Sequence, residues 1–241
     1  MARPRYPRHS GPLPPPLPPL TRTVGQLVGE TINAYRRRPW AALGIGAIAA
    51  SVNLLATELS TSWRLAFVAV VGALAFTAAY VLACSVVHDV RLEPALVRSP
   101  FVLGVLVFVP FPLLASLYIL PGLAWLALVG LGVPAALVER LGVREGFSRG
   151  LALGRADYVH ALGALATVTI LVALTQWVMF FLLREYADNT QRVAATLTYL
   201  VASPLVFLGA ALLYTDQAAR VGTTREERQR ARLGAPSQPA D

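Results

Sequence analysis

The stretch FVLGVLVFVPFPLLASLYILPGLAWLALVGLGVPAALV, residues 101–138, contains no charged residue. An α-helix rises about 1.5 Å per residue, so a single helix over this stretch would be roughly 57 Å long. The hydrocarbon core of a membrane is only about 30 Å thick. The chain must therefore reverse direction within the stretch, and Leu120-Pro121-Gly122 is its clearest turn signal. We predict two membrane-spanning helices here, over residues 101–120 and 122–138.

Four further apolar stretches have the length that one membrane crossing requires. The overall composition agrees, because 56% of the 241 residues are hydrophobic and only 14% are charged. A soluble domain usually has about 25% charged residues, so lipid must cover much of this surface. We predict an all-α, polytopic membrane protein with six transmembrane helices in a domain over residues 40–218, together with amphipathic interfacial helices. The other four spans are predicted over residues 40–56, 65–87, 159–183 and 197–214.

The arginines predict the orientation of these spans. All 21 basic residues are arginines, and only Arg64, Arg184 and Arg192 lie between spans one and two or between spans five and six. By the positive-inside rule, both termini are expected in the cytoplasm. The absence of lysine, with abundant Ala, Gly and Pro, suggests a bacterial genome, and hence a bacterial cytoplasmic (inner) membrane. Because the arginines cluster between apolar runs, the net charge of +8 does not indicate a nucleic-acid partner.

Both ends of the chain are polar. Residues 1–20 are rich in proline and arginine, which predicts a disordered cytoplasmic tail. This tail is either a spacer, the interpretation that we favour, or a ligand for a proline-binding partner. Residues 219–241 are predicted to form a loose polar cytoplasmic tail, with at most one helical turn over residues 226–232.

Residues 21–39 have the pattern of an amphipathic interfacial helix. Apolar residues recur on one helical face, and Thr23 and Gln26 have the spacing of a capping box. We expect this helix to lie on the membrane with its terminal arginines facing phospholipid phosphates. The alternative is a helix packed on a neighbouring cytoplasmic loop. The three arginines are Arg36, Arg37 and Arg38.

A second interfacial helix is predicted over residues 141–157, directly after Glu139 closes span four. Within it, Glu145 and Arg149 have the i,i+4 spacing of an ion pair. Arg149 is also placed to reach a lipid phosphate or a carboxylate of another span, such as Asp89. Four glycines at four-residue spacing favour close approach of another helix, and a flexible loop is the alternative. These glycines are Gly142, Gly146, Gly150 and Gly154.

Several of these segments resemble a bacterial membrane-protein family. The segments are GQLVGETINAYRRRPW (residues 25–40), Pro121-Gly122, Pro134 with Glu139, and GFSRGLAL (residues 146–153). Together they resemble the membrane domain of the glycerophosphoryl diester phosphodiesterase type, although Gly150 stands where that family often has serine. In enzymes with this region, catalysis belongs to a separate soluble domain. The resemblance therefore implies a membrane module without catalytic residues.

Histidines and carboxylates gather at the predicted cytoplasmic ends of the spans. They offer a metal site in principle, since His and carboxylate at i,i+3 share a helix face. We favour the alternative that the carboxylates form interfacial ion pairs with Arg91, Arg140 and Arg155, and we expect no cofactor or catalytic residue. The five candidates are His88, Asp89, Glu139, Asp157 and His160.

Within the predicted spans the strongly polar residues are few and uncharged. This argues against a proton relay or an ion-coupling site. Hydrogen bonding between helices, notably by Asn53 and Gln176, is favoured over a substrate site. The lone Cys84 is expected to serve as a small apolar residue. The remaining intramembrane polar residues are Thr77, Tyr80, Thr167, Thr169, Thr175 and Ser203.

The sequence thus predicts a non-enzymatic, lipid-associated membrane-organising or accessory protein with phospholipids as partners. A small transporter or permease-like component is the alternative, and a membrane enzyme with an interfacial metal site is a second one. Neither a nucleophile–base pair nor a recognised metal motif is present to support the last.

Overall fold

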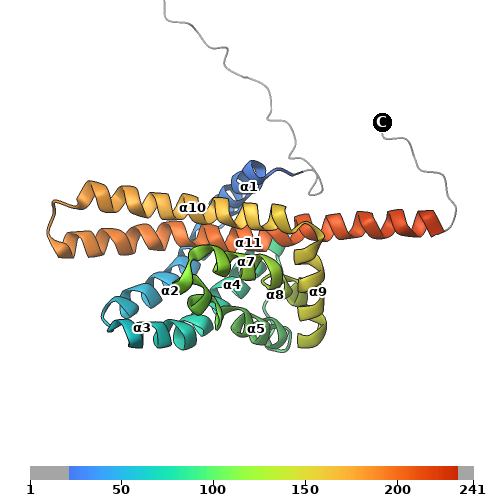
Figure 1. Ribbon diagram of the computed structural model, residues 1–241, viewed down its shortest axis with the longest axis horizontal. Coiled ribbons are helices and arrows are strands. Elements are labelled where there is room, and N and C mark those ends of the chain that lie inside the picture. The colour runs from blue at the N-terminus through green and yellow to red at the C-terminus, as the bar shows by residue number, and fades with distance from the viewer. Residues whose placement is uncertain (1–21, 233–241) are drawn as a thin grey trace, which may run out of the picture.

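The computed structural model describes residues 22–232, and that part of the chain is all-α, without a strand. Helices over six segments of this range are long and apolar enough to cross a membrane, so the chain is a multi-pass membrane protein (Figure 1). A π-helical turn at Val68–Gly72 joins two of the helices. The helices are α1 (Val24–Arg37), α2 (Pro39–Thr57), α3 (Thr61–Phe67), α4 (Ala73–His88), α5 (Pro94–Phe108), α6 (Phe111–Leu117), α7 (Ile119–Val129), α8 (Gly132–Val138), α9 (Val143–Ala156), α10 (Tyr158–Leu183) and α11 (Asp188–Arg232).

All six predicted spans are present, but several of their bounds differ from the prediction. The third begins at Pro94 instead of residue 101, because a proline fits the first helical turn, where its missing N–H is not needed. For the same reason the turn between spans three and four does not lie at Pro121, which sits in the first turn of α7. The chain reverses at Tyr118, whose backbone is extended. The spanning segments are Pro39–Thr57, Thr61–His88, Pro94–Leu117, Ile119–Val138, Tyr158–Leu183 and Asn189–Gly222.

The predicted capping box at the start of α1 is confirmed. The Thr23 hydroxyl accepts from the backbone N–H of Gln26, whose side chain accepts from the N–H of Thr23. The apolar face of α1 packs on α10 and α11, with Leu27 and Thr31 almost fully buried. Ile32 on the same face stays 42% exposed, so protein covers this face only in part. Helix α1 thus packs on two membrane spans and not on a cytoplasmic loop, and its position on the membrane surface stays a prediction.

The two ends of the bundle differ in construction. At one end α9 lies crosswise to α10 and α11, under the ends of α7 and α8 (Figure 1). We call this the α9 end, and the end with residues 58–60 and 184–187 the opposite end. The main core lies between α4, α5, α8 and α11, and Cys84 is fully buried in it, as the prediction of an apolar role requires.

Helix α11 is much longer than a membrane crossing. Its 45 residues give a helix of roughly 68 Å, more than twice the hydrocarbon thickness. It projects beyond the bundle at the α9 end (Figure 1). The prediction of a loose tail is therefore wrong for residues 219–232, which continue helix α11. Residues 1–21 and 233–241, with the predicted N-terminal tail, lie outside the described range.

Proline interrupts the hydrogen bonding of α11 at one contact with α2. Pro204 has no N–H to donate to the carbonyl of Leu200, one turn earlier. Gly46 of α2 lies directly on this carbonyl, so closely that an added Cβ would overlap the oxygen. A glycine is needed here because any side chain would push α2 away from α11.

Candidate functional site

Two residues of other helices hold the carboxylate of Glu139 at the α9 end. Arg149 of α9 donates from Nε to both carboxylate oxygens, at 2.9 and 3.1 Å. Tyr214 of α11 donates its hydroxyl to one of them, at 2.9 Å. The Arg149 and Glu139 side chains are only 21% and 29% exposed, so water screens the pair partially. The contact joins the end of α8 to α9 and α11.

The backbone after α8 brings Glu139 and Arg149 together. Arg140 has φ 55°, a left-handed conformation that reverses the chain after α8. Glu145, which we predicted to pair with Arg149, caps the start of α9 instead, accepting from the Gly142 N–H at 3.4 Å. Because a carboxylate in the first turn of a helix stabilises unpaired N–H groups, Glu145 is used locally and Glu139 becomes the partner of Arg149.

Three further ion pairs lie at the α9 end. Arg38 pairs with Asp89 at 2.6 Å, and Arg220 pairs with Asp157 at 2.5 Å. The third pair joins Arg22, just before α1, to Asp216 of α11 at 2.7 Å. The Asp216 side chain is fully buried, whereas that of Asp89 is 82% exposed. These pairs differ greatly in solvent screening, so only the Arg22–Asp216 pair is strongly coupled to the fold.

The predicted ion pairing occurs, but with arginines other than Arg91, Arg140 and Arg155. Asp89 pairs with Arg38, so the suggested contact between Asp89 and Arg149 is also wrong. The actual partners come from other helices or from α9, which sequence spacing could not indicate. Ion pairing thus depends on how α1, α9 and α11 fold against the spans.

The five residues weighed for a metal site do not converge on one point. His88 Nε2 is 3.1 Å from the carbonyl of Ala211, and its ring meets Tyr214 edge-on. Asp157 caps α10 by accepting from the backbone N–H of His160 at 3.1 Å. Within residues 22–232, no group of three or more His, Cys, Asp or Glu side chains is placed to hold a metal ion.

The glycines of α9 pack against α7 and α8, as their spacing predicts. A Cβ at Gly150 would overlap the backbone of Gly132, and one at Gly154 would overlap the carbonyl of Leu128. A Cβ at Gly146 would come within 2.7 Å of Leu103. Gly142 differs, because it is the N-cap of α9 and has open space around it. Three glycines therefore let α9 lie flat under the bundle.

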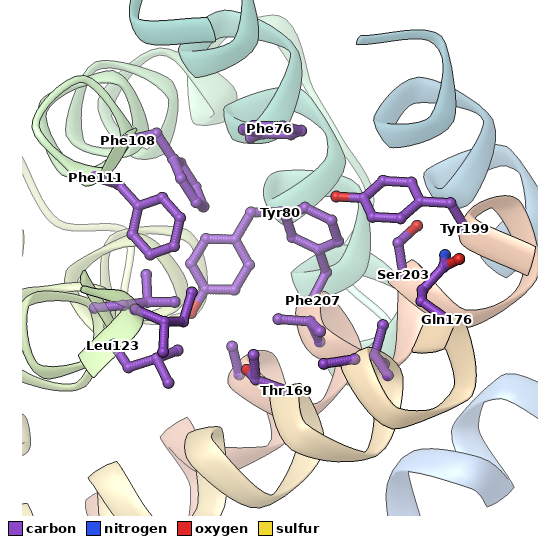
Figure 2. Close-up of a pocket in the computed structure, with 16 residues that line it drawn as sticks. Phe76, Tyr80, Phe108, Phe111, Leu123, Thr169, Gln176, Tyr199, Ser203 and Phe207 are labelled. Atoms are coloured by element: carbon purple, nitrogen blue, oxygen red, sulfur yellow. The ribbon is translucent and has the colours of Figure 1, made fainter. Parts of the chain in front are cut away.

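A cavity of about 280 Å³ lies among the spans, between α4, the end of α5, α6, α7, α10 and α11 (Figure 2). It extends from mid-membrane, at Thr169, toward the opposite end, at Gln176. Exposed Ile119 of α7 and Ala173 of α10 lie at its rim, so it borders the surface that faces lipid. Six of its 16 lining residues are aromatic: Phe76, Tyr80, Phe108, Phe111, Tyr199 and Phe207.

Four buried polar atoms of the cavity wall have no hydrogen-bond partner in the described part of the chain. They are Tyr80 Oη, Thr169 Oγ1, Gln176 Nε2 and Ser203 Oγ. An unpaired buried polar group costs about 1–3 kcal/mol. Thr167 and Thr175 of the same helix α10 avoid this cost, because each donates to the carbonyl four residues earlier at 2.8 Å. The cavity wall thus gathers four unpaired polar atoms, while α10 outside it has one more, His160 Nε2 near the α9 end.

The sequence identified these polar residues but not their common location. We favoured hydrogen bonds between helices, yet Gln176 Nε2 lacks any partner among residues 22–232, and Asn53 is exposed on α2. The i,i+4 spacing of Phe76 and Tyr80 and the i,i+3 spacing of Phe108 and Phe111 were available signs of an aromatic wall, although the second pair lies on two helices, α5 and α6. Their convergence depends on the packing of α4 against α5, which spacing alone does not reveal.

No protein-family model matches this chain, and no curated protein or solved structure matches it either.

Proposed function

We propose that this chain is a lipid-associated accessory protein of a bacterial cytoplasmic membrane, and that its intramembrane cavity takes up part of a membrane lipid. One observation carries the proposal: an aromatic-walled cavity borders the lipid-facing surface between α7 and α10. Its size is near the lower end of ligand pockets, which are about 300–1,000 Å³. A single acyl or isoprenoid segment suits such a volume, with the rest of the molecule remaining in the bilayer.

In this proposal the α9 end faces the cytoplasm, because most arginines lie there. Arg36 and Arg37 at the end of α1 are exposed and suit contact with phospholipid phosphates. The resemblance to the membrane domain of glycerophosphoryl diester phosphodiesterases supports the same role. The proposed role is binding and not catalysis.

Retention of lipid tests the proposal. We would purify the protein in a mild detergent and measure bound lipid by native mass spectrometry. Ala173→Trp places an indole at the rim of the cavity, while Ala195→Trp places one on an exposed site of α11 outside the lining. The wild type and Ala195→Trp should retain lipid, and Ala173→Trp should lose most of it. Equal retention by all three proteins would contradict a lipid site in the cavity.

A lipid or small-molecule carrier is the second candidate, because the helices around the cavity are interrupted. The π-helical turn at Val68–Gly72 ends one turn before Phe76, and the breaks at Pro110 and Tyr118 flank α6. Interrupted helices commonly form sites in transporters. Movement of a fluorescent lipid across vesicles containing the protein would favour this candidate. Binding without such movement would favour the accessory role.

A further inference from the structure

We propose that the cavity selects an uncharged lipid bearing carbonyl oxygens, which accept hydrogen bonds from Tyr80, Thr169, Gln176 and Ser203. This inference rests on the proposed function, since it names the class of molecule that the same cavity would hold. It concerns the polar part of the ligand, whereas the proposed function depends on the apolar part.

The unpaired groups define the chemistry of this polar part. Three are hydroxyls and the fourth is an amide nitrogen, so all four can donate a hydrogen bond. The lining contains no charged side chain to balance a phosphate or a carboxylate. A charged headgroup in this cavity would therefore be desolvated without compensation. An uncharged ligand with acceptor oxygens satisfies the donors without that penalty.

Two of the donors are deeply buried and cannot turn to bulk solvent. The Tyr80 side chain is 1% exposed, and its ring packs edge-on against Phe108 with centroids 6.0 Å apart. Ser203 is 4% exposed. Packing thus fixes the Tyr80 ring, and both hydroxyls belong to the wall of the cavity (Figure 2). A ligand oxygen is the natural partner for groups held in this way.

The register of α10 and α11 arranges the donors at two levels. These helices run antiparallel, and Val168 lies beside Gly209. Counting along both helices from this contact places Gln176 opposite Val201, two residues or about 3 Å along the axis from Ser203. Thr169 lies seven residues from Gln176, or about 10 Å along the helix axis. Figure 2 likewise shows Gln176 near Ser203, and Thr169 nearer the Tyr80 hydroxyl. The ligand therefore meets donors at mid-membrane and again toward the opposite end.

Two kinds of membrane lipid supply uncharged carbonyl oxygens. One is a glycerolipid such as diacylglycerol, through its ester carbonyls. The other is an isoprenoid quinone, through its ring carbonyls, and its flat ring also suits stacking on the aromatic wall. Both share the chemistry that the donors recognise, so a binding experiment must separate them.

The test compares an ester lipid with its ether counterpart, which lacks only the carbonyl oxygens, and adds a quinone as the second carbonyl ligand. Detergent-solubilised protein would be titrated with diacylglycerol, its dialkyl ether counterpart and a short-chain quinone, with affinity measured by thermal shift and native mass spectrometry. Tyr80→Phe and Ser203→Ala remove hydroxyls with little change of shape. Thr175→Ala is the matched control, since its hydroxyl binds the helix backbone outside the cavity lining. Melting without ligand would confirm that each variant folds.

We expect the wild type and Thr175→Ala to bind the diester or the quinone about tenfold more tightly than the ether. Tyr80→Phe and Ser203→Ala should reduce this preference while binding of the ether stays unchanged. Whichever of the diester and the quinone binds more tightly identifies the class of lipid that the cavity prefers. Equal affinity for ester, ether and quinone would overturn the carbonyl inference and leave the proposed function intact. Failure of all three to bind would overturn the proposed function as well.

Discussion

Arg149 Nε lies 2.9 and 3.1 Å from the two carboxylate oxygens of Glu139, so one nitrogen joins α9 to the end of α8. A charge-assisted contact with limited exposure contributes about 1.5–3 kcal/mol. Arg149→Ala should therefore lower the melting temperature clearly more than Arg144→Ala or Arg155→Ala, which alter exposed arginines of the same helix. Equal melting temperatures for the three variants would show that the contact contributes no stability.

The buried pair of Arg22 and Asp216 should contribute more to the free energy of unfolding than the exposed pair of Arg38 and Asp89. Arg22→Ala leaves a fully buried carboxylate without its nearest cation, which typically costs about 3–5 kcal/mol. Arg38→Ala removes an exposed pair and should cost under about 1 kcal/mol. Chemical unfolding of both variants in detergent measures the difference. A larger loss for Arg38→Ala would contradict the burial of Asp216.

Substitution of Gly150 should separate α9 from α8. In Gly150→Ala the new methyl group overlaps the backbone of Gly132, and overpacking of this kind costs about 1–3 kcal/mol. Gly163→Ala is the control, because nothing lies within 4 Å of the added Cβ. It should leave stability unchanged or raise it by up to about 1 kcal/mol through helix propensity. If both variants have the same free energy of unfolding, α9 does not pack as closely as the structure shows.

The membrane orientation is open to a direct labelling test. Cys84 is the only cysteine and is buried, so Cys84→Ser gives a background without other thiols. In this background, Ser60→Cys and Ala187→Cys should react with a membrane-impermeant maleimide in intact cells. Glu93→Cys and Ser148→Cys, which lie at the α9 end, should react only after permeabilisation. The reverse pattern would place the α9 end outside the cell.

Much of the fold could be predicted from hydropathy because lipid imposes a simple constraint on each span. A span needs about 20 apolar residues whatever its neighbours are, so each one is visible in its own sequence. The same holds for the capping box of Thr23 and Gln26, which is complete within four residues. Features of this kind depend on one segment alone.

The candidate site could not be predicted, because it depends on contacts between segments. The ion pair between Glu139 and Arg149 requires the left-handed backbone of Arg140, which no pattern in the sequence predicts. The cavity likewise requires that Gln176 and Ser203 come close together on antiparallel helices. A one-residue shift turns a helix face by about 100°, so knowing each helix separately leaves this alignment undetermined.

Because of its length, helix α11 joins the interior of the membrane to the region beyond the α9 end. From Pro204 to Arg232 the helix continues for 28 residues, or roughly 42 Å. The first part of this stretch is held inside the bundle, where Leu208, Leu213 and Gln217 are fully buried. Ser203 and Phe207, on either side of Pro204, belong to the cavity wall. One continuous helix thus connects a chamber inside the bilayer with a segment that projects beyond the α9 end of the bundle.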